Sequence, residues 1–122
     1  MTQQIMVVDD DPMIRFLVQE YLTAVGYSVT ACGGGAEALG SLQNFTPDLI
    51  ILDLQMPEMN GLEVLENLRR TPATEKIPVL LLSANASDAK SESGVTADHY
   101  LEKPFQMSDF LAAVKSTTRR AE

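Results

Sequence analysis

The fold of this 122-residue chain is organised around residues 49–61, which read Leu49-Ile50-Ile51-Leu52-Asp53-Leu54-Gln55-Met56-Pro57-Glu58-Met59-Asn60-Gly61. Four consecutive aliphatic residues before Asp53 are typical of a strand that is buried on both faces of a parallel sheet. The residues after Asp53 are rich in turn formers, so the strand ends in a tight loop. Parallel sheets place ligand sites just outside the carboxyl ends of their strands, which makes Asp53 a candidate functional residue. Taken alone, the stretch also fits a loop aspartate that only caps the next helix.

Length, charge and cysteine content limit what the chain can be. At 122 residues it is long enough for one domain with a sizeable core, and we expect a single domain over residues 1–122. The formal net charge of −8 argues against direct nucleic-acid binding and against binding to anionic membranes, so a protein or a cation is the expected partner. Cys32 is the only cysteine, which excludes a disulfide framework. With no signal-peptide pattern and no apolar stretch of roughly 18 residues, the sequence predicts a cytoplasmic protein.

Strand and helix patterns alternate along the chain. Apolar and β-branched runs predict strands at residues 5–8, 27–32, 49–52, 78–82 and 100–102. Apolar residues at helical spacing predict helices over residues 12–25, near residues 38–42, over residues 62–70, and from about Ser108, which is a good N-cap. We expect Gly26 to end the first helix in a left-handed conformation. This alternation implies a parallel sheet covered by helices on both faces.

Residues 85–95 do not fit the alternation. A crossover helix is expected between the fourth and fifth strands, yet residues 85–94 contain no side chain larger than alanine to bury. We therefore predict a fourth helix that is short, frayed or absent.

Charged and polar residues follow four of the predicted strands: Asp9 and Asp10, then Asp53, Ser83 and Lys103. The carboxyl ends of parallel strands meet at one edge of the sheet, so these side chains should converge. Three neighbouring carboxylates repel one another, and Mg²⁺ with oxygen ligands relieves that repulsion. Lys103 has no acceptor atom and suits a phosphoryl oxygen. Together these residues indicate phosphoryl transfer.

Three blocks of the sequence resemble the receiver domain of two-component response regulators. The blocks are Val7-Val8-Asp9-Asp10-Asp11-Pro12, residues 47–61 and Tyr100-Leu101-Glu102-Lys103-Pro104-Phe105, and the likeness runs from about residue 5 to residue 114. The resemblance implies a doubly wound, flavodoxin-like α/β fold with a five-stranded parallel sheet in the order 2-1-3-4-5. The chain departs from the family at Thr96, where receivers usually have glycine, and in a slightly short interval from Ser83 to Lys103.

The resemblance also implies where phosphate and metal bind. Asp53 would accept a phosphoryl group from the phosphohistidine of a sensor histidine kinase or a phosphotransfer protein. Asp10, Asp53 and the backbone carbonyl of Gln55 would hold Mg²⁺, with Asp9 assisting through water. Similar domains slowly remove their own phosphate, but we expect a signalling domain and not an enzyme.

The remaining implied roles concern phosphate contacts and switching. Ser83 would hydrogen-bond one phosphoryl oxygen and Lys103 would pair with another, through a Lys103-Pro104 peptide that the family keeps cis. Tyr100 would move inward together with Ser83 and so alter a surface that binds a downstream protein.

Several motifs have simpler interpretations. The run from Asp9 to Asp11 alone would more often be a capped helix start, and Asp11 itself is expected to be only the cap. Residues 33–35 are three glycines that lack the Gly-Lys-Ser/Thr ending of a phosphate-binding loop, so we interpret them as a flexible loop. His99 has no ligand spacing and is expected at the surface.

Two other classes of function compete with a phosphorylated receiver. One is a receiver-like interaction module that works without phosphate through a remodelled fourth-helix region. The other is a phosphatase with an aspartyl nucleophile, suggested by the spacing of Asp9 and Asp11, although the chain is short and has no cap domain for a substrate.

Overall fold

The computed structural model describes residues 2–56, 58–84 and 96–118 of the chain. Its strands are β1 (Gln4–Val8), β2 (Ser28–Cys32), β3 (Leu49–Asp53), β4 (Val79–Ser83) and β5 (His99–Glu102). Its helices are α1 (Pro12–Ala24), α2 (Gly35–Ser41), α3 (Gly61–Arg70) and α4 (Met107–Thr117). All the predicted strands and helices within these residues are present. The prediction for residues 85–95 lies outside the described residues.

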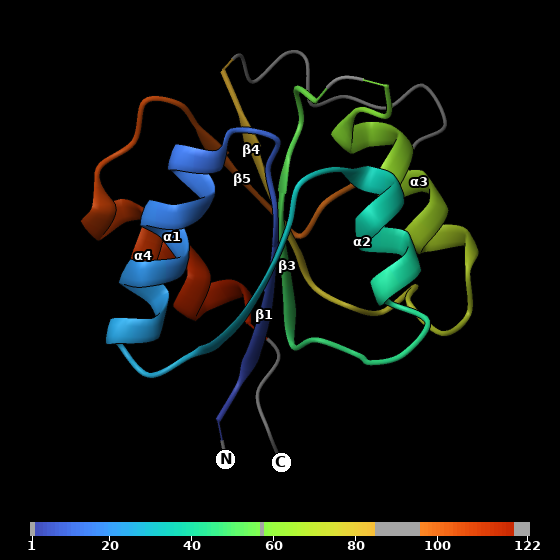
Figure 1. The fold of residues 1–122 in the computed structure, drawn as a ribbon, viewed down its shortest axis with the longest axis horizontal. Helices are drawn as coiled ribbons and strands as arrows, with labels where there is room; N and C mark the ends of the chain where they lie inside the picture. The colour runs from blue at the N-terminus through green and yellow to red at the C-terminus, as the bar shows by residue number, and fades with distance from the viewer. Residues whose placement is uncertain (1, 57, 85–95, 119–122) are drawn as a thin grey trace.

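The five strands form one parallel sheet in the order β2-β1-β3-β4-β5. Helices α1 and α4 cover one face and α2 and α3 cover the other, so the molecule has three layers with the sheet in the middle (Figure 1). The predicted doubly wound fold and its strand order are therefore confirmed. The carboxyl ends of the strands all meet at one edge of the sheet, which is where the sequence places its charged residues.

Each face of the sheet has its own apolar core because successive side chains of a strand point to opposite faces. On β3, Ile50 and Leu52 pack with the α2 and α3 residues, whereas Leu49 and Ile51 pack with the α1 and α4 residues. All five residues of β3 are buried, as are all five of β4. The aliphatic runs of the sequence thus correspond to the central strands of the sheet. Every helix in the described part of the chain is too short or too polar to span a lipid bilayer.

The ends of α1 agree with the sequence-based expectation. The Asp11 side chain accepts hydrogen bonds from the backbone N–H of Met13 (2.9 Å) and of Ile14 (3.4 Å), and Pro12 is the first residue of the helix. Gly26 follows the helix with φ of 105°, a left-handed conformation that suits glycine. Both predicted boundaries are confirmed.

The start of α4 differs from its prediction. The N-cap is Gln106, whose side chain makes no capping hydrogen bond, and Ser108 lies inside the first turn. The backbone N–H of Phe110 donates to the Gln106 carbonyl at 3.0 Å, and Phe110 is fully buried. The helix therefore begins at Met107, one residue before Ser108, and the Phe110 N–H closes its first turn.

The triple glycine is also more ordered than a flexible loop. Gly35 is the buried first residue of α2, and a Cβ atom there would lie 2.6 Å from Cγ2 of Val64 on α3. The Gly33 N–H donates to the Glu37 carboxylate at 3.0 Å. Gly35 permits close packing of α2 on α3, which sequence spacing cannot reveal.

Candidate functional site

The predicted site residues lie at the carboxyl edge of the sheet. Asp53 is the last residue of β3 and Ser83 the last of β4, while Asp9 and Lys103 directly follow β1 and β5. Asp9, Asp53 and Ser83 are buried, with 2%, 3% and 3% exposure. These strands are neighbours in the sheet, so parallel pairing brings together residues that are far apart in the sequence.

Three carboxylates form a compact acidic cluster. Asp9, Asp10 and Asp53 each offer one carboxylate oxygen, and these three atoms lie within 4.8 Å of one another. Asp10 is exposed, so the cluster is open to solvent at one side. Hard oxygen ligands in this number and charge suit Mg²⁺, which usually keeps several waters and takes only a few carboxylates from the protein.

Asp9 provides a test of whether a cation fits. Its Oδ1 atom accepts the Asp11 N–H at 2.9 Å, but its buried Oδ2 atom has no hydrogen-bond partner among the described residues. The pKa of Asp9 is raised to about 6, chiefly by burial and also by the Asp53 carboxylate, against the lowering effect of the Asp11 N–H. A buried carboxylate oxygen without a partner is costly. A cation held by Asp9, Asp10 and Asp53 would supply the missing partner, so the donor set fits a metal.

Lys103 provides the positive charge of the site. Its Nζ atom lies 3.2 Å from Oδ1 of Asp53, and the Gln55 N–H donates to the same oxygen at 3.3 Å. The Lys103 side chain is 28% exposed, whereas that of Asp53 is 5% exposed. The Lys103-Pro104 peptide is cis, in agreement with the resemblance. Lys103 thus brings its ammonium to the Asp53 carboxylate from the solvent side of the site.

Ser83 and Tyr100 occupy different environments. Asp53 is paired with Leu82 in the sheet, so Ser83 lies one residue further along the neighbouring strand. Tyr100 on β5 is 40% exposed, and its hydroxyl accepts the Ala97 N–H at 3.2 Å. Ser83 is therefore part of the buried edge beside Asp53, whereas Tyr100 faces outward in this structure.

Gly61 allows the loop after Asp53 to close tightly. A Cβ atom at Gly61 would lie 2.6 Å from the Asp53 carbonyl oxygen and 2.7 Å from Cα of Leu54. The Gly61 N–H donates to the Leu54 carbonyl at 2.8 Å, and Asn60 and Glu63 form a capping box on α3. The first turn of α3 is thereby held against the end of β3. This explains why the sequence places a glycine, Gly61, eight residues beyond Asp53.

The family comparison agrees with this geometry. A family model described as the response regulator receiver domain matches residues 5–115. The chain belongs to this family. It is a response regulator receiver domain.

Similar proteins include curated regulators and solved receivers. Response regulator MprA of Mycobacterium sp. strain KMS is 39% identical over 98% of this chain and 52% of its own length. The phosphate regulon transcriptional regulatory protein PhoB of Rhizobium meliloti strain 1021 is 36% identical over the whole of this chain and 55% of its own length. The chain therefore spans about half the length of these curated relatives.

Two solved structures show the same fold. Chemotaxis protein CheY4 of Vibrio cholerae superposes with a TM-score of 0.88 at 29% identity, covering 96% of this chain and 99% of its own. Response regulator TrrA of Thermotoga maritima, solved in complex with Mg²⁺ and BeF, has a TM-score of 0.84 at 35% identity, covering 94% of this chain and 98% of its own.

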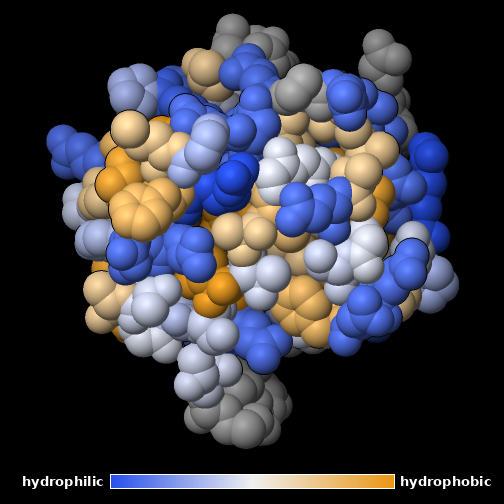
Figure 2. Space-filling model, viewed as in Figure 1, coloured by the Kyte–Doolittle hydropathy of each residue, from blue (hydrophilic) through white to orange (hydrophobic). Residues whose placement is uncertain are grey.

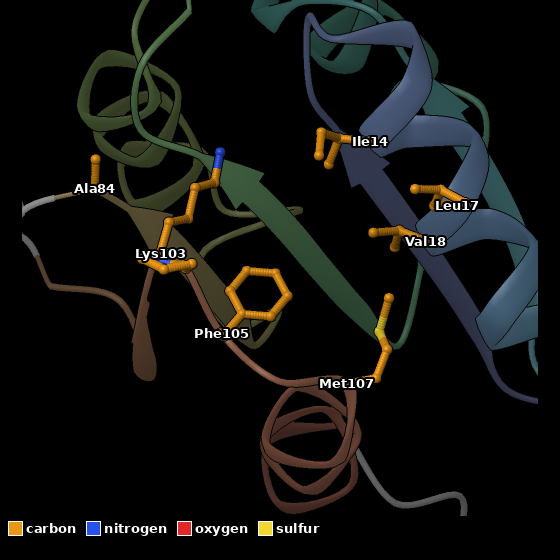
Figure 3. Close-up of a pocket in the computed structure, with 8 residues that line it drawn as sticks. Ile14, Leu17, Val18, Ala84, Lys103, Phe105 and Met107 are labelled. Atoms are coloured by element: carbon orange, nitrogen blue, oxygen red, sulfur yellow. The ribbon is translucent and has the colours of Figure 1, made fainter.

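An apolar groove adjoins the cationic side of this receiver. It lies between α1 and the segment after β5, has a volume of about 490 Å³, and includes Ile14, Leu17, Phe105 and Met107 in its walls. In Figure 3 the α1 side chains face Phe105 and Met107 across the groove, and Lys103 extends toward the end of β3. The groove therefore begins beside Lys103, whose ammonium pairs with Asp53.

The α1 surface near this groove is unusually apolar. Met13, Phe16 and Leu17 are 70%, 59% and 49% exposed. Figure 2 shows apolar surface among polar residues on the side of the molecule that carries α1. Exposed apolar side chains that cluster near a site are typical of a protein-binding surface.

One contact in the acidic cluster is not predicted by the sequence patterns. The Arg15 guanidinium donates from Nη1 to the Asp9 carbonyl at 2.9 Å and so connects α1 to the end of β1. The sequence feature that could have indicated this contact is a basic residue placed one turn into the helix that follows an acidic loop. Asp11, in contrast, acts as the expected cap, and His99 is exposed as expected.

Proposed function

We propose that this receiver domain accepts a phosphoryl group on Asp53 and uses the modified site to change a protein-binding surface. The contact that carries the proposal is the 3.2 Å approach of the Lys103 ammonium to the Asp53 carboxylate, beside the acidic cluster with Asp9 and Asp10. Among the acids of the described residues, Asp53 alone combines a strand-end position, a neighbouring lysine and two nearby carboxylates.

The chemistry follows from how these groups are placed. A carboxylate oxygen of Asp53 attacks the phosphorus of a phosphoimidazole in line, the P–O bond forms as the P–N bond breaks, and the released imidazole nitrogen takes a proton from solvent. Asp53 is held by the Gln55 N–H and Lys103, so little reorganisation precedes attack. Lys103 is positioned to pair with a phosphoryl oxygen as the charge moves onto Asp53. Mg²⁺ held by Asp9, Asp10, Asp53 and the Gln55 carbonyl would neutralise the acids and the phosphoryl oxygens when bound.

Switching would involve Ser83 and Tyr100. Phosphorylation adds negative charge and three acceptor oxygens at the end of β3. The Ser83 hydroxyl, on the adjacent strand, would move toward one of these oxygens. Tyr100 would exchange its outward position and its Ala97 contact for an inward one, which would change the surface around β5.

The phosphodonor would be a sensor histidine kinase or a phosphotransfer protein, as expected from the family. The apolar groove beside Lys103 lies on the approach to Asp53, so the donor would cover it together with α1. A downstream protein would bind after switching. We expect a cytoplasmic signalling domain and not an enzyme with a separate substrate. The expectation of no nucleic-acid binding concerns these 122 residues only, since one relative of twice the length is named a transcriptional regulatory protein.

The test is phosphorylation by a small donor. Incubation with acetyl phosphate and a magnesium salt should add one acid-stable, base-labile phosphoryl group, measured by intact mass. Asp53→Asn should abolish the labelling, and Asp109→Asn, an exposed acid on α4, should retain it. Labelling of the Asp53→Asn variant would refute the assignment, and no labelling of the parent would instead favour the interaction module that works without phosphate.

A further inference from the structure

Asp98, immediately before β5, forms two hydrogen bonds with the first residue of β4. Its backbone N–H donates to the Val79 carbonyl at 3.0 Å, and its Oδ2 atom accepts the Val79 N–H at 2.8 Å. The side chain thus closes a ring with a residue 19 positions earlier in the chain. Such a pair of bonds is possible only in one register of β5 against β4.

The same arrangement occurs once more among the amino ends of the strands, between Asp48 and Gln4. Asp48, immediately before β3, donates its backbone N–H to the Gln4 carbonyl at 2.7 Å and accepts the Gln4 N–H on Oδ2 at 2.7 Å. Gln4 is the first residue of β1. Asp48 and Asp98 therefore hold β3 and β5, respectively, at the amino ends of their neighbours.

Each of the two aspartates precedes one residue of the ion pair by the same number of positions in the sequence. Asp53 is five residues after Asp48, and Lys103 is five residues after Asp98. Strand β3 begins directly after Asp48 and ends at Asp53, and β5 begins directly after Asp98 and leads to Lys103. These two strands therefore carry the two partners of the ion pair between Lys103 and Asp53. We propose that Asp48 and Asp98 are register clips, positioning residues that bring the Lys103 ammonium to the acceptor carboxylate.

Strand geometry supplies the physical reason. A slip of one residue moves a strand by roughly 3.3 Å and turns its side chains to the opposite face of the sheet. Either change would break a contact of 3.2 Å between Nζ of Lys103 and Oδ1 of Asp53. The register of β5 against β4, in which Ser83 is opposite Glu102, is therefore a condition for the ion pair.

The two clips should differ in importance because their strands differ in burial. All five residues of β3 are buried, so a slip of β3 would expose its apolar core. In β5, His99, Tyr100 and Glu102 are exposed and only Leu101 is half-buried, so side-chain burial specifies its register weakly. β5 also lies at the edge of the sheet. The Asp98 clip should thus carry most of the register information for Lys103.

Arg69 reinforces the Asp98 clip and has no counterpart on Asp48 among the contacts of the described residues. Its Nη2 atom lies 2.7 Å from Oδ2 of Asp98, while Nη1 donates to the carbonyls of Ile77 (2.7 Å) and Glu75 (3.0 Å). The guanidinium therefore joins the end of α3, the loop before β4 and the start of β5. Hydrogen bonds between charged groups of this geometry are stronger than neutral ones.

The experiment compares beryllofluoride binding with Mg²⁺ binding, since Lys103 addresses the phosphoryl position whereas the acidic cluster lies on β1 and β3. This inference rests on the proposed function, so the parent protein is measured first. If the parent binds Mg²⁺ but no beryllofluoride, the proposed function fails, whatever the clips do. The remaining outcomes apply to a parent that binds both.

Asp98→Ala should weaken beryllofluoride binding by about 10- to 100-fold, because misplacement of a site residue by ~1 Å has effects of that size. Mg²⁺ affinity should stay within about twofold, since all its expected ligands remain in place. Asp98→Asn should restore most of the beryllofluoride affinity, because its amide oxygen still accepts the Val79 N–H. Asp48→Ala is the matched control and should weaken beryllofluoride binding less than Asp98→Ala does.

Arg69→Gln keeps both Asp98 bonds to Val79 and covers the case in which Asp98→Ala does not fold. It should weaken beryllofluoride binding by about threefold, with Mg²⁺ affinity unchanged. The inference is overturned if Asp98→Ala or, where that variant is unfolded, Arg69→Gln binds beryllofluoride as the parent does. Equal losses of Mg²⁺ and beryllofluoride affinity would also overturn it, because they indicate general destabilisation and not a displaced lysine.

Discussion

The acidic and cationic halves of the site are supported very differently. Asp53 ends a strand that lies between β1 and β4 and is buried along its whole length, and Asp9 is almost inaccessible. Lys103 follows an edge strand whose residues are mostly exposed, and its own side chain remains partly in solvent. The difference indicates that Asp53 and Asp9 are pre-positioned by the core. Under the proposed function, Lys103 and Tyr100 belong to the more exposed part that would adjust when the charge on Asp53 changes.

The largest expected effect is a difference in the free energy of unfolding between a substitution on β3, which ends in Asp53, and one on β5, which precedes Lys103. Ile51→Ala on β3 should lower the free energy of unfolding by about 3–5 kcal/mol, because it leaves a cavity at a position with 0% exposure. Leu101→Ala on β5 should cost under about 2 kcal/mol, since its side chain is only partly buried. Urea denaturation followed by circular dichroism measures both values. Equal losses for the two variants would mean that β5 is as firmly packed as β3.

The next effect concerns the charge of the buried acid. The pKa of Asp9 is raised from its ordinary value of 3.8 to about 6, so between these pH values the folded chain binds more protons than the unfolded chain. The free energy of unfolding should therefore fall as pH rises through this window and stay lowered above pH 6. In the presence of a chelator, Asp9→Asn should raise the free energy of unfolding by about 2 kcal/mol at pH 8 and leave it nearly unchanged below pH 4.

Binding of Mg²⁺ should offset the destabilisation caused by the charged Asp9 carboxylate, so addition of Mg²⁺ provides the control for this prediction. Adding Mg²⁺ at about 100 times its dissociation constant should stabilise the parent by roughly 2.7 kcal/mol and Asp9→Asn by less. The exposed substitution Asp109→Asn should change neither the pH profile nor the response to Mg²⁺. A parent whose urea midpoint is the same with Mg²⁺ and with chelator would exclude the proposed metal site.

The smallest effect on stability is expected at Lys103. Lys103→Met should alter the free energy of unfolding by under about 1 kcal/mol, because the ion pair is partly screened by solvent on the lysine side. The functional effect should be clear nevertheless. The variant should bind Mg²⁺ as the parent does but lose the NMR shift of Tyr100 that beryllofluoride causes in the parent. A parent-like shift in Lys103→Met would mean that another group contacts the phosphoryl position.

The sequence patterns alone predicted a parallel sheet and the residues that converge at its carboxyl edge, whereas the strand order came from the family resemblance. Unbroken aliphatic runs such as residues 49–52 are typical of buried strands, and their alternation with helical patterns indicates parallel connections. Parallel strands must end at one edge, so acids at the ends of the first and third strands had to meet there. The cap at Asp11 and the stop at Gly26 were predictable because they depend on neighbours within a few residues.

Other features were decided by contacts between distant parts of the chain. Nothing near Ser108 in the sequence shows that the N-cap of α4 is Gln106. No local pattern shows that Asp48 bonds to Gln4, 44 residues away, or that Asp98 bonds to Val79.

The electrostatic details of the site depend on the same kind of contact. The pKa of Asp9 rises chiefly because folding removes water from it, and the Asp53 carboxylate, 44 residues further along the chain, adds to the rise. Sequence spacing specifies which strand and which end a residue occupies. Distances of about 3 Å, burial and the register of an exposed edge strand arise only when the whole sheet has formed.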